Sequence, residues 1–167
     1  MKKTRTTAAA LGVAALLGAG MVAGQAFGAT TTGTTTTATA TDAELAAALT
    51  VAREEERMAR DLYAALAARY DGARPFSTIT RSEERHFDAV GALLDQYDVP
   101  DPAAGKPAGT YAVPAVQGLY DSWLTDGKVS LDAAYQVGVE LEKRDIADLE
   151  ATIADDLPAD VDAVLGR

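Results

Sequence analysis

Apolar side chains recur every three or four positions along most of the chain after residue 41, which is the spacing of one face of an α-helix. The pattern predicts a first helix over residues 41–70, opened by Thr41 and Glu44 as a capping box. A second helix is predicted from a cap at Ser77 or Thr78 to about residue 97, where prolines follow. No alternating strand pattern competes with these periods, so the predicted fold class is all-α.

The second half of the chain predicts a long connection and a third main helix. Residues 103–109 are expected to be loop, and residues 114–124 a short helix with proline in its first turn. Ser130 is expected to cap the third main helix, which ends before the Asp-Leu-Pro break at 156–158. Residues 160–165 then add a last amphipathic turn or two. The second and third main helices are therefore joined by a long crossover that contains the short helix.

The apolar face of the second helix also carries two ionisable side chains. Its stripe, with alternating spacings of four and three residues, consists of Ile79, Glu83, His86, Val90, Leu93 and Tyr97. Burial of a carboxylate and an imidazole is unfavourable unless a partner binds them. A metal ion is one such partner, and Glu-x-x-His is the spacing at which two side chains of one helix reach the same ion.

Acidic residues also fall on the inward stripes of two other helices. In the first helix Glu55 and Glu56 both lie at the stripe, whereas Glu54 is expected on the solvated face. In the third main helix Glu142 and Asp145 lie on the inward side. In an antiparallel bundle these acids can meet the second helix at one level of the core. Carboxylates with one imidazole suit iron or manganese better than a metal that prefers thiolates.

Asp145 has two possible roles. The favoured one is an ion pair with one of three arginines, which are Arg60, Arg81 and Arg85. The other is to orient His86, as residues behind the ligands of metal sites commonly do.

The first 29 residues have the layout of a secretory signal peptide. Three basic residues precede an apolar run over residues 8–22, and small residues follow up to Ala29. The run is short and alanine-rich for a permanent membrane span, so an uncleaved anchor is the less favoured alternative. Residues 30–41 are almost all Thr, Ala and Gly and predict a flexible linker. The folded domain is expected over residues 42–167, in a protein that is secreted or associated with the cell envelope.

Net charge and cysteine content limit the classes of partner and of covalent modification that the protein can have. Of the 15 basic residues three lie in the signal-like segment, so 12 remain against 25 acidic residues, a formal charge of −13. This balance argues against nucleic acid as a partner, and against a membrane once the signal is cleaved. The chain has no cysteine, which excludes disulfides and a lipid-modified cysteine.

Residues 53–63, 82–90 and 137–149 resemble the DUF2202 family in order and spacing, and the resemblance covers about residues 43–165. It implies membership of the ferritin-like superfamily, with an antiparallel helical bundle and a long crossover. The family has no established biochemical function. Similarity to rubrerythrin-type proteins, which place a glutamate seven residues before a tyrosine, favours Glu56 over Glu55 as a ligand.

The metal ligands expected from the inward stripes and the resemblance are Glu56, Glu83, His86 and Glu142, and no catalytic residue is predicted. They would hold non-haem iron or manganese and support chemistry with oxygen or peroxide, whether or not the protein is an enzyme. Family members extend the last helix through a segment resembling Gly-Ser-Arg-Asn-His, whereas this chain ends at Gly-Arg. The fourth helix is therefore expected to be truncated.

Three consequences of a shortened helix remain open. The first is a degenerate or mononuclear site, and the second is a site completed by a partner chain in a homodimer. The third is a truncated reading frame. The alternative function is a metal-free helical binding or scaffold module of the cell envelope with a degenerate metal site.

Overall fold

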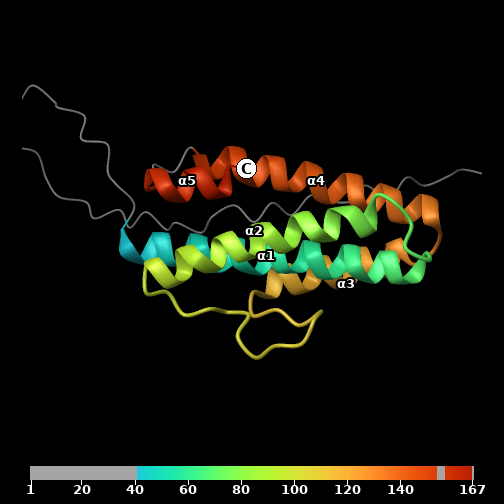
Figure 1. The fold of residues 1–167 in the computed structure, drawn as a ribbon, viewed down its shortest axis with the longest axis horizontal. Helices are drawn as coiled ribbons and strands as arrows, with labels where there is room; N and C mark the ends of the chain where they lie inside the picture. Colours follow the sequence, from blue (N-terminus) through green and yellow to red (C-terminus); the bar gives the residue numbers. More distant parts are fainter. Residues whose placement is uncertain (1–40, 154–156, 167) are drawn as a thin grey trace, which may run out of the picture. The chain divides into compact units, whose positions relative to one another are not determined.

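The computed structural model of the protein describes residues 41–153 and 157–166, and every regular element within these residues is a helix. The helices are α1 (Asp42–Arg69), α2 (Phe76–Gln96), α3 (Pro114–Gly127), α4 (Leu131–Ile153) and α5 (Ala159–Leu165), as Figure 1 shows. The all-α prediction is confirmed, and the short helix α3 lies between α2 and α4 as expected. The predicted signal peptide and most of the linker fall outside the described residues. None of the helices in the described part has the length and apolar content needed to cross a membrane.

Two helices begin with the side-chain caps that the sequence predicts. At the start of α1, the Thr41 hydroxyl accepts a hydrogen bond from the Glu44 amide (3.3 Å), and the Glu44 carboxylate accepts one from the Thr41 amide (2.8 Å). This is the predicted capping box, which satisfies amides that have no partner within the helix. At the start of α4, the Ser130 hydroxyl accepts a hydrogen bond from the Ala133 amide (3.0 Å).

The predicted start of α2 is wrong. The helix begins at Phe76, and neither Ser77 nor Thr78 caps it. Pro75 already has helical backbone angles (φ −86°, ψ −9°), so the first turn forms before the chain reaches the two hydroxyl residues. The Ser77 hydroxyl instead donates a hydrogen bond to the carbonyl of Gly72 in the preceding loop (3.1 Å).

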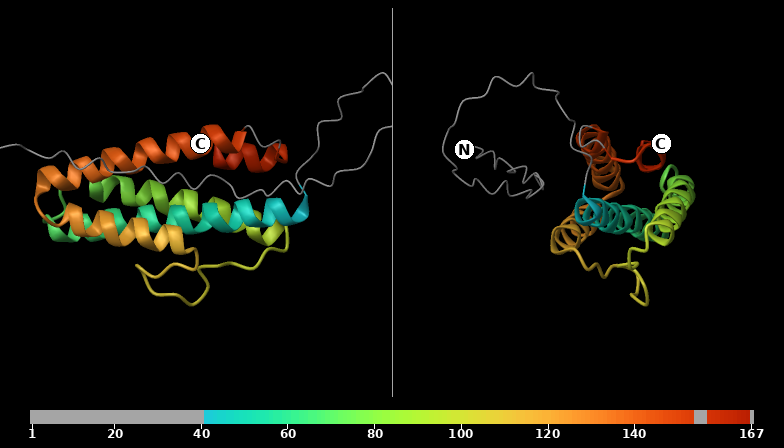
Figure 2. Two further views of the ribbon diagram at one scale, coloured as in Figure 1. Left: turned by 180° about the vertical axis from the view of Figure 1, so that it is seen from behind. Right: turned by 90° about the vertical axis from the view of Figure 1, so that its left-hand side faces the viewer.

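The other helices are arranged around α1. It runs antiparallel to α2 and contacts it extensively, and it also contacts α3. In the end-on view of Figure 2, α1 lies between α2 and α3, with α4 and α5 on one side of this row. α5 contacts both α2 and α4, whereas direct contacts between α1 and α4 are few. The space between α1, α2 and α4 is therefore bordered by side chains, because the backbones of α1 and α4 are not closely packed there.

Apolar side chains form two separate clusters along the bundle. The larger cluster joins the second half of α1 to α3 and the first half of α4, and includes Leu62, Tyr63, Trp123 and Leu141. The smaller cluster joins the start of α1 to the end of α2 and to α5, and includes Leu45, Leu49, Leu94 and Val161. The candidate ligands of α1 and α2 lie between the two clusters in sequence, so polar residues interrupt the core there.

Charged side chains of α1 hold the long crossover at residues 97–113. Glu54 is completely buried, and its carboxylate accepts hydrogen bonds from the amides of Ala112 and Val113. Arg57, also buried, lies 3.4 Å from Glu54 and donates to three carbonyls, those of Lys106, Pro107 and Thr110. The expectation that Glu54 is solvated is therefore wrong, because the face of α1 that looks away from the cavity is covered by the crossover.

Arg53 and Asp61 make further contacts on either side of Glu54 and Arg57 along α1. The Arg53 guanidinium pairs with Asp101 (2.8 Å) and lies over the ring of Phe87. The Asp61 carboxylate accepts a hydrogen bond from the hydroxyl of Tyr111 (3.0 Å). One stripe of α1 thereby fixes the crossover at several points.

We expect Glu54→Ala to lower the free energy of unfolding by about 3 kcal/mol, because it leaves the buried Arg57 without its carboxylate. Urea unfolding of the metal-free protein measures the loss. Glu140→Ala, which removes an exposed acid from α4, is the control and should change stability by less than about 0.5 kcal/mol. Equal losses in the two variants would contradict the role given to Glu54.

Candidate metal centre

Glu56 of α1 and Glu83 and His86 of α2 meet between the two apolar clusters. One ligand atom of each residue lies within 4.8 Å of the other two. The Nδ1 atom of His86 is 3.5 Å from Oε2 of Glu56 and 3.9 Å from Oε2 of Glu83. A single ion can reach all three atoms at ordinary bond lengths of about 2.0–2.2 Å after small side-chain movements.

The stripe predicted for α2 explains how two of these side chains face inward. Glu83 is only 7% exposed, and Val90, seven residues later on the same face, is 1% exposed. His86 lies one turn after Glu83 and is partly exposed, so it borders the open side of the site. α1 is antiparallel to α2 and brings Glu56 to the same level.

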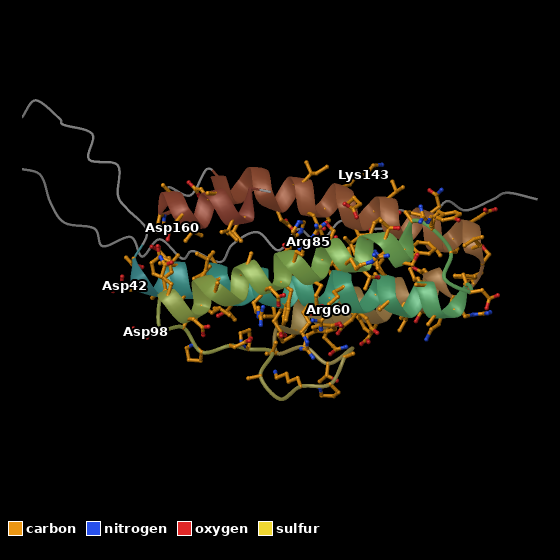
Figure 3. The ribbon with its side chains drawn as sticks, in the orientation of Figure 1. Asp42, Arg60, Arg85, Asp98, Lys143 and Asp160 are labelled. Carbon is orange, nitrogen blue, oxygen red and sulfur yellow. The ribbon has the colours of Figure 1, made fainter. Side chains whose placement is uncertain are left out.

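The three residues line a cavity of about 230 Å³ that extends to α4. Its other ionisable lining residues are Glu55, Glu142, Asp145 and Asp148, and its apolar ones are Ala52, Ala59, Ile146 and Leu165. In Figure 3, Arg85 marks the part of α2 next to His86, and Lys143 marks the part of α4 next to Glu142. The cavity is thus lined by acids of three helices.

Glu142 lines this cavity and is engaged by a buried tyrosine. The hydroxyl of Tyr63, a completely buried residue, donates to Oε1 of Glu142 at 2.6 Å and also lies 3.3 Å from the carbonyl of Gly138. Burial, and then the hydrogen bond to Glu142, raise the pKa of Tyr63 far above its usual range. Tyr63 therefore remains a hydrogen-bond donor and fixes one oxygen of Glu142.

Glu55 and Glu56 are neighbours in sequence but have different partners. Arg144 donates from Nη2 to Oε1 of Glu55 (3.3 Å), and its Nε lies 3.1 Å from Oδ2 of Asp148. The structure places Glu56, not Glu55, beside His86. Sequence reasoning missed Arg144 and Asp148, although a spacing of four residues on one helix is typical of an ion pair.

The ion pair expected for Asp145 is wrong. Arg60, one of its three predicted partners, pairs instead with Asp61 (2.9 Å) and Glu84 (3.1 Å). Among the residues described, Asp145 forms no ion pair with Arg60 or with the other two arginines, and it lines the cavity. Arg60 is bound by acids of α1 and α2, which the pattern of α4 could not reveal.

Loss of hydration and mutual repulsion dominate the electrostatics of the cavity. Burial is the main cause that raises the pKa of Glu56 to about 8, and that of Glu55 and of Glu83 to about 7. Neighbouring carboxylates add to the effect, as Glu83 does for Glu56. Glu56 and Glu83 are therefore at least partly protonated near neutral pH, and a cation that binds them must displace the protons.

This arrangement defines an all-helical bundle protein with a carboxylate and histidine cavity between its helices. Residues 46–165 match the DUF2202 family, described as an uncharacterized protein domain, and the chain belongs to that family. The resemblance seen in the sequence is thereby confirmed at the level of the family.

A relative from Methanocaldococcus jannaschii shares both sequence and fold. The uncharacterized protein MJ0754 of Methanocaldococcus jannaschii is 40% identical over 101 residues, which cover 60% of this chain and 54% of MJ0754. The matched segment thus spans about half of that protein. The crystal structure of hypothetical protein MJ0754 from Methanococcus jannaschii DSM 2661 matches with a TM-score of 0.71 and 31% identity, covering 88% of this chain and 75% of the other.

We expect the metal-free protein to lose stability as pH rises from about 5 to 9. The carboxyl groups of Glu56 and Glu83 have raised pKa values when folded, so the stability they contribute is complete below their ordinary pKa of 4.5 and is lost through about 7 to 8. Melting temperature against pH measures this loss.

The variant Glu56→Gln should flatten that pH dependence, because an amide does not titrate. Glu140→Gln, on the exposed face of α4, should leave the slope unchanged. A Glu56→Gln profile parallel to that of the unaltered protein would show that Glu56 is not desolvated as described.

Proposed function

We propose that the protein binds non-haem iron or manganese through Glu56, Glu83 and His86. The observation that carries the proposal is the convergence of three ligand atoms from two helices within 4.8 Å of one another. Two carboxylates and one imidazole form a donor set that iron and manganese favour, and the chain has no thiolate to offer a softer metal. Glu142 is the fourth candidate ligand, through the oxygen that Tyr63 does not contact.

Membership of the ferritin-like superfamily is part of this proposal. Three features support it: a Glu-x-x-His pair on α2, glutamates on α1 and α4 that line the same cavity, and a long crossover after α2. Ferritin-like bundles hold their metals with glutamates and Glu-x-x-His pairs in this manner. The described part of α5 is short, and only Leu165 at its end borders the cavity.

The chemistry proposed for the site is oxidation of a bound metal by oxygen or peroxide. Iron or manganese, when bound, would supply this redox chemistry. The residues of the chain set the conditions for it. The carboxyl groups of Glu56 and Glu83 release protons as they bind a cation, because their pKa values are raised in the free cavity. Tyr63 keeps its proton and holds Glu142 in place, and His86 borders an open side that admits a small oxidant.

A metal-free helical module remains the second candidate, and one observation favours it. The raised pKa values of Glu56 and Glu83 indicate that these acids are partly neutral near neutral pH without any cation, which lowers the cost of a metal-free cavity. The two candidates differ in whether chelation changes stability, since a ligand that binds only the folded state raises its melting temperature.

Export is proposed from composition alone. The basic start and apolar run of residues 1–29 support a cleaved signal, with the Thr-rich segment of residues 30–41 as a tether. Expression of the full chain in a bacterial host, followed by mass determination of protein from the medium and envelope, should find a new N-terminus near residue 30. Retention of an unprocessed chain inside the cells would contradict this proposal.

We expect the unaltered protein to retain iron or manganese after aerobic loading and gel filtration, and the double variant Glu83→Ala/His86→Ala to retain only background amounts. Metal content per chain, measured by inductively coupled plasma mass spectrometry, gives the result. The matched control is Asp88→Ala/Asp95→Ala, which removes two exposed acids from the same helix.

A chelator should lower the melting temperature of the loaded protein and of the control, and leave that of the Glu83/His86 variant unchanged. A site occupied at about 100 times its dissociation constant adds about 2.7 kcal/mol to stability, which is a readily measured shift. Equal metal content in both double variants would sink the assignment of the ligands.

A further inference from the structure

Arg144 is a positively charged side chain beside cavity acids that are not proposed as metal ligands. Its side chain is 17% exposed and contacts two acids that line the cavity, Glu55 across the space to α1 and Asp148 one turn along α4. Arg144 thereby links α1 and α4 in a region where the two helices have few direct contacts. Its position suggests that it neutralises part of the cavity that a second ion would otherwise occupy.

The cavity acids divide into two groups by their partners. Glu56, Glu83 and His86 lie together without a basic side chain between them. On the other side, Glu55 and Asp148 are bound by Arg144, and Glu142, the fourth candidate ligand, accepts the hydrogen bond of Tyr63 with one of its oxygens. Among the acids on that side, Asp145 alone has neither an arginine nor a tyrosine as partner in the described part of the chain.

We infer that Arg144 limits the cavity to one metal ion per chain by occupying Glu55 and Asp148 as a built-in cation. This inference rests on the function proposed above. The positive charge of a guanidinium repels a divalent cation held by the same acids. Removal of the guanidinium would free two carboxylates beside Asp145 and make a second position available.

The charge of Arg144, rather than its shape, should determine how many ions bind. Arg144→Lys keeps a positive charge near Glu55 and Asp148, whereas Arg144→Gln removes it while retaining a polar side chain of similar length. Lys143→Gln removes a positive charge from the neighbouring, exposed position and serves as the control. A role limited to stability would lower the melting temperature of Arg144→Gln without any change in the number of ions bound.

Titration with Mn²⁺ under anaerobic conditions, monitored by electron paramagnetic resonance, counts bound ions and detects magnetic coupling between adjacent ones. We expect about one Mn²⁺ per chain for the unaltered protein, Arg144→Lys and Lys143→Gln. Arg144→Gln should bind close to two with a coupled spectrum, and the added change Glu55→Gln should return it to about one. Circular dichroism confirms that each variant is folded, and the Glu55 comparison within Arg144→Gln tests the idea even if that variant is less stable.

The outcomes separate this inference from the proposed function. One ion in both the unaltered protein and Arg144→Gln overturns the role of Arg144 and leaves the metal site in place. Two ions in the unaltered protein overturn the limit of one and likewise retain the site. No bound ion in any of the proteins overturns the proposed function and the inference with it.

Discussion

A carboxylate that leaves water loses several kcal/mol of hydration, which it must regain from a partner or avoid by holding a proton. This chain places the carboxyl groups of three helices around a cavity that lies between two apolar clusters. The acids there respond in each of the available ways: Glu55 pairs with Arg144, Glu142 accepts a hydrogen bond from Tyr63, and Glu56 holds its proton. The apolar clusters maintain this cavity, because each of them contains residues of both α1 and α2.

The first helix performs two tasks with one short segment. Residues 53–61 present one charged stripe to the crossover and another to the cavity, separated by the 100° turn between successive residues. Glu54 and Glu56 are two residues apart, yet the first is a structural anchor and the second borders the candidate ligands. Composition cannot distinguish these roles, since both side chains are glutamates in one run of acids.

The sequence predicts most where a signal is local. Thr41 and Glu44 form the expected cap because both partners lie within one helical turn, and the stripe of α2 places Glu83 inward because its period is fixed by the helix. Predictions fail where the deciding partner is distant in sequence. Glu54 is buried by a loop more than fifty residues later, and the binding of Glu55 by Arg144 of α4 was not predicted at all. Pro75 shows a third cause, in which backbone geometry overrides a hydroxyl cap that the residue types favour.

The double use of α1 has a consequence for how the chain can change over time. A substitution between residues 53 and 61 affects one stripe, but an inserted or deleted residue rotates everything after it by about 100° relative to what precedes it. Such a change would rotate the crossover anchors Arg57 and Asp61 away from the face that carries Arg53 and Glu54. It would also rotate Glu56 relative to Tyr63 if it fell between them, or relative to Glu55 if it separated those two. The length of this segment is thus constrained twice over, once by the crossover that it anchors and once by the cavity that it lines.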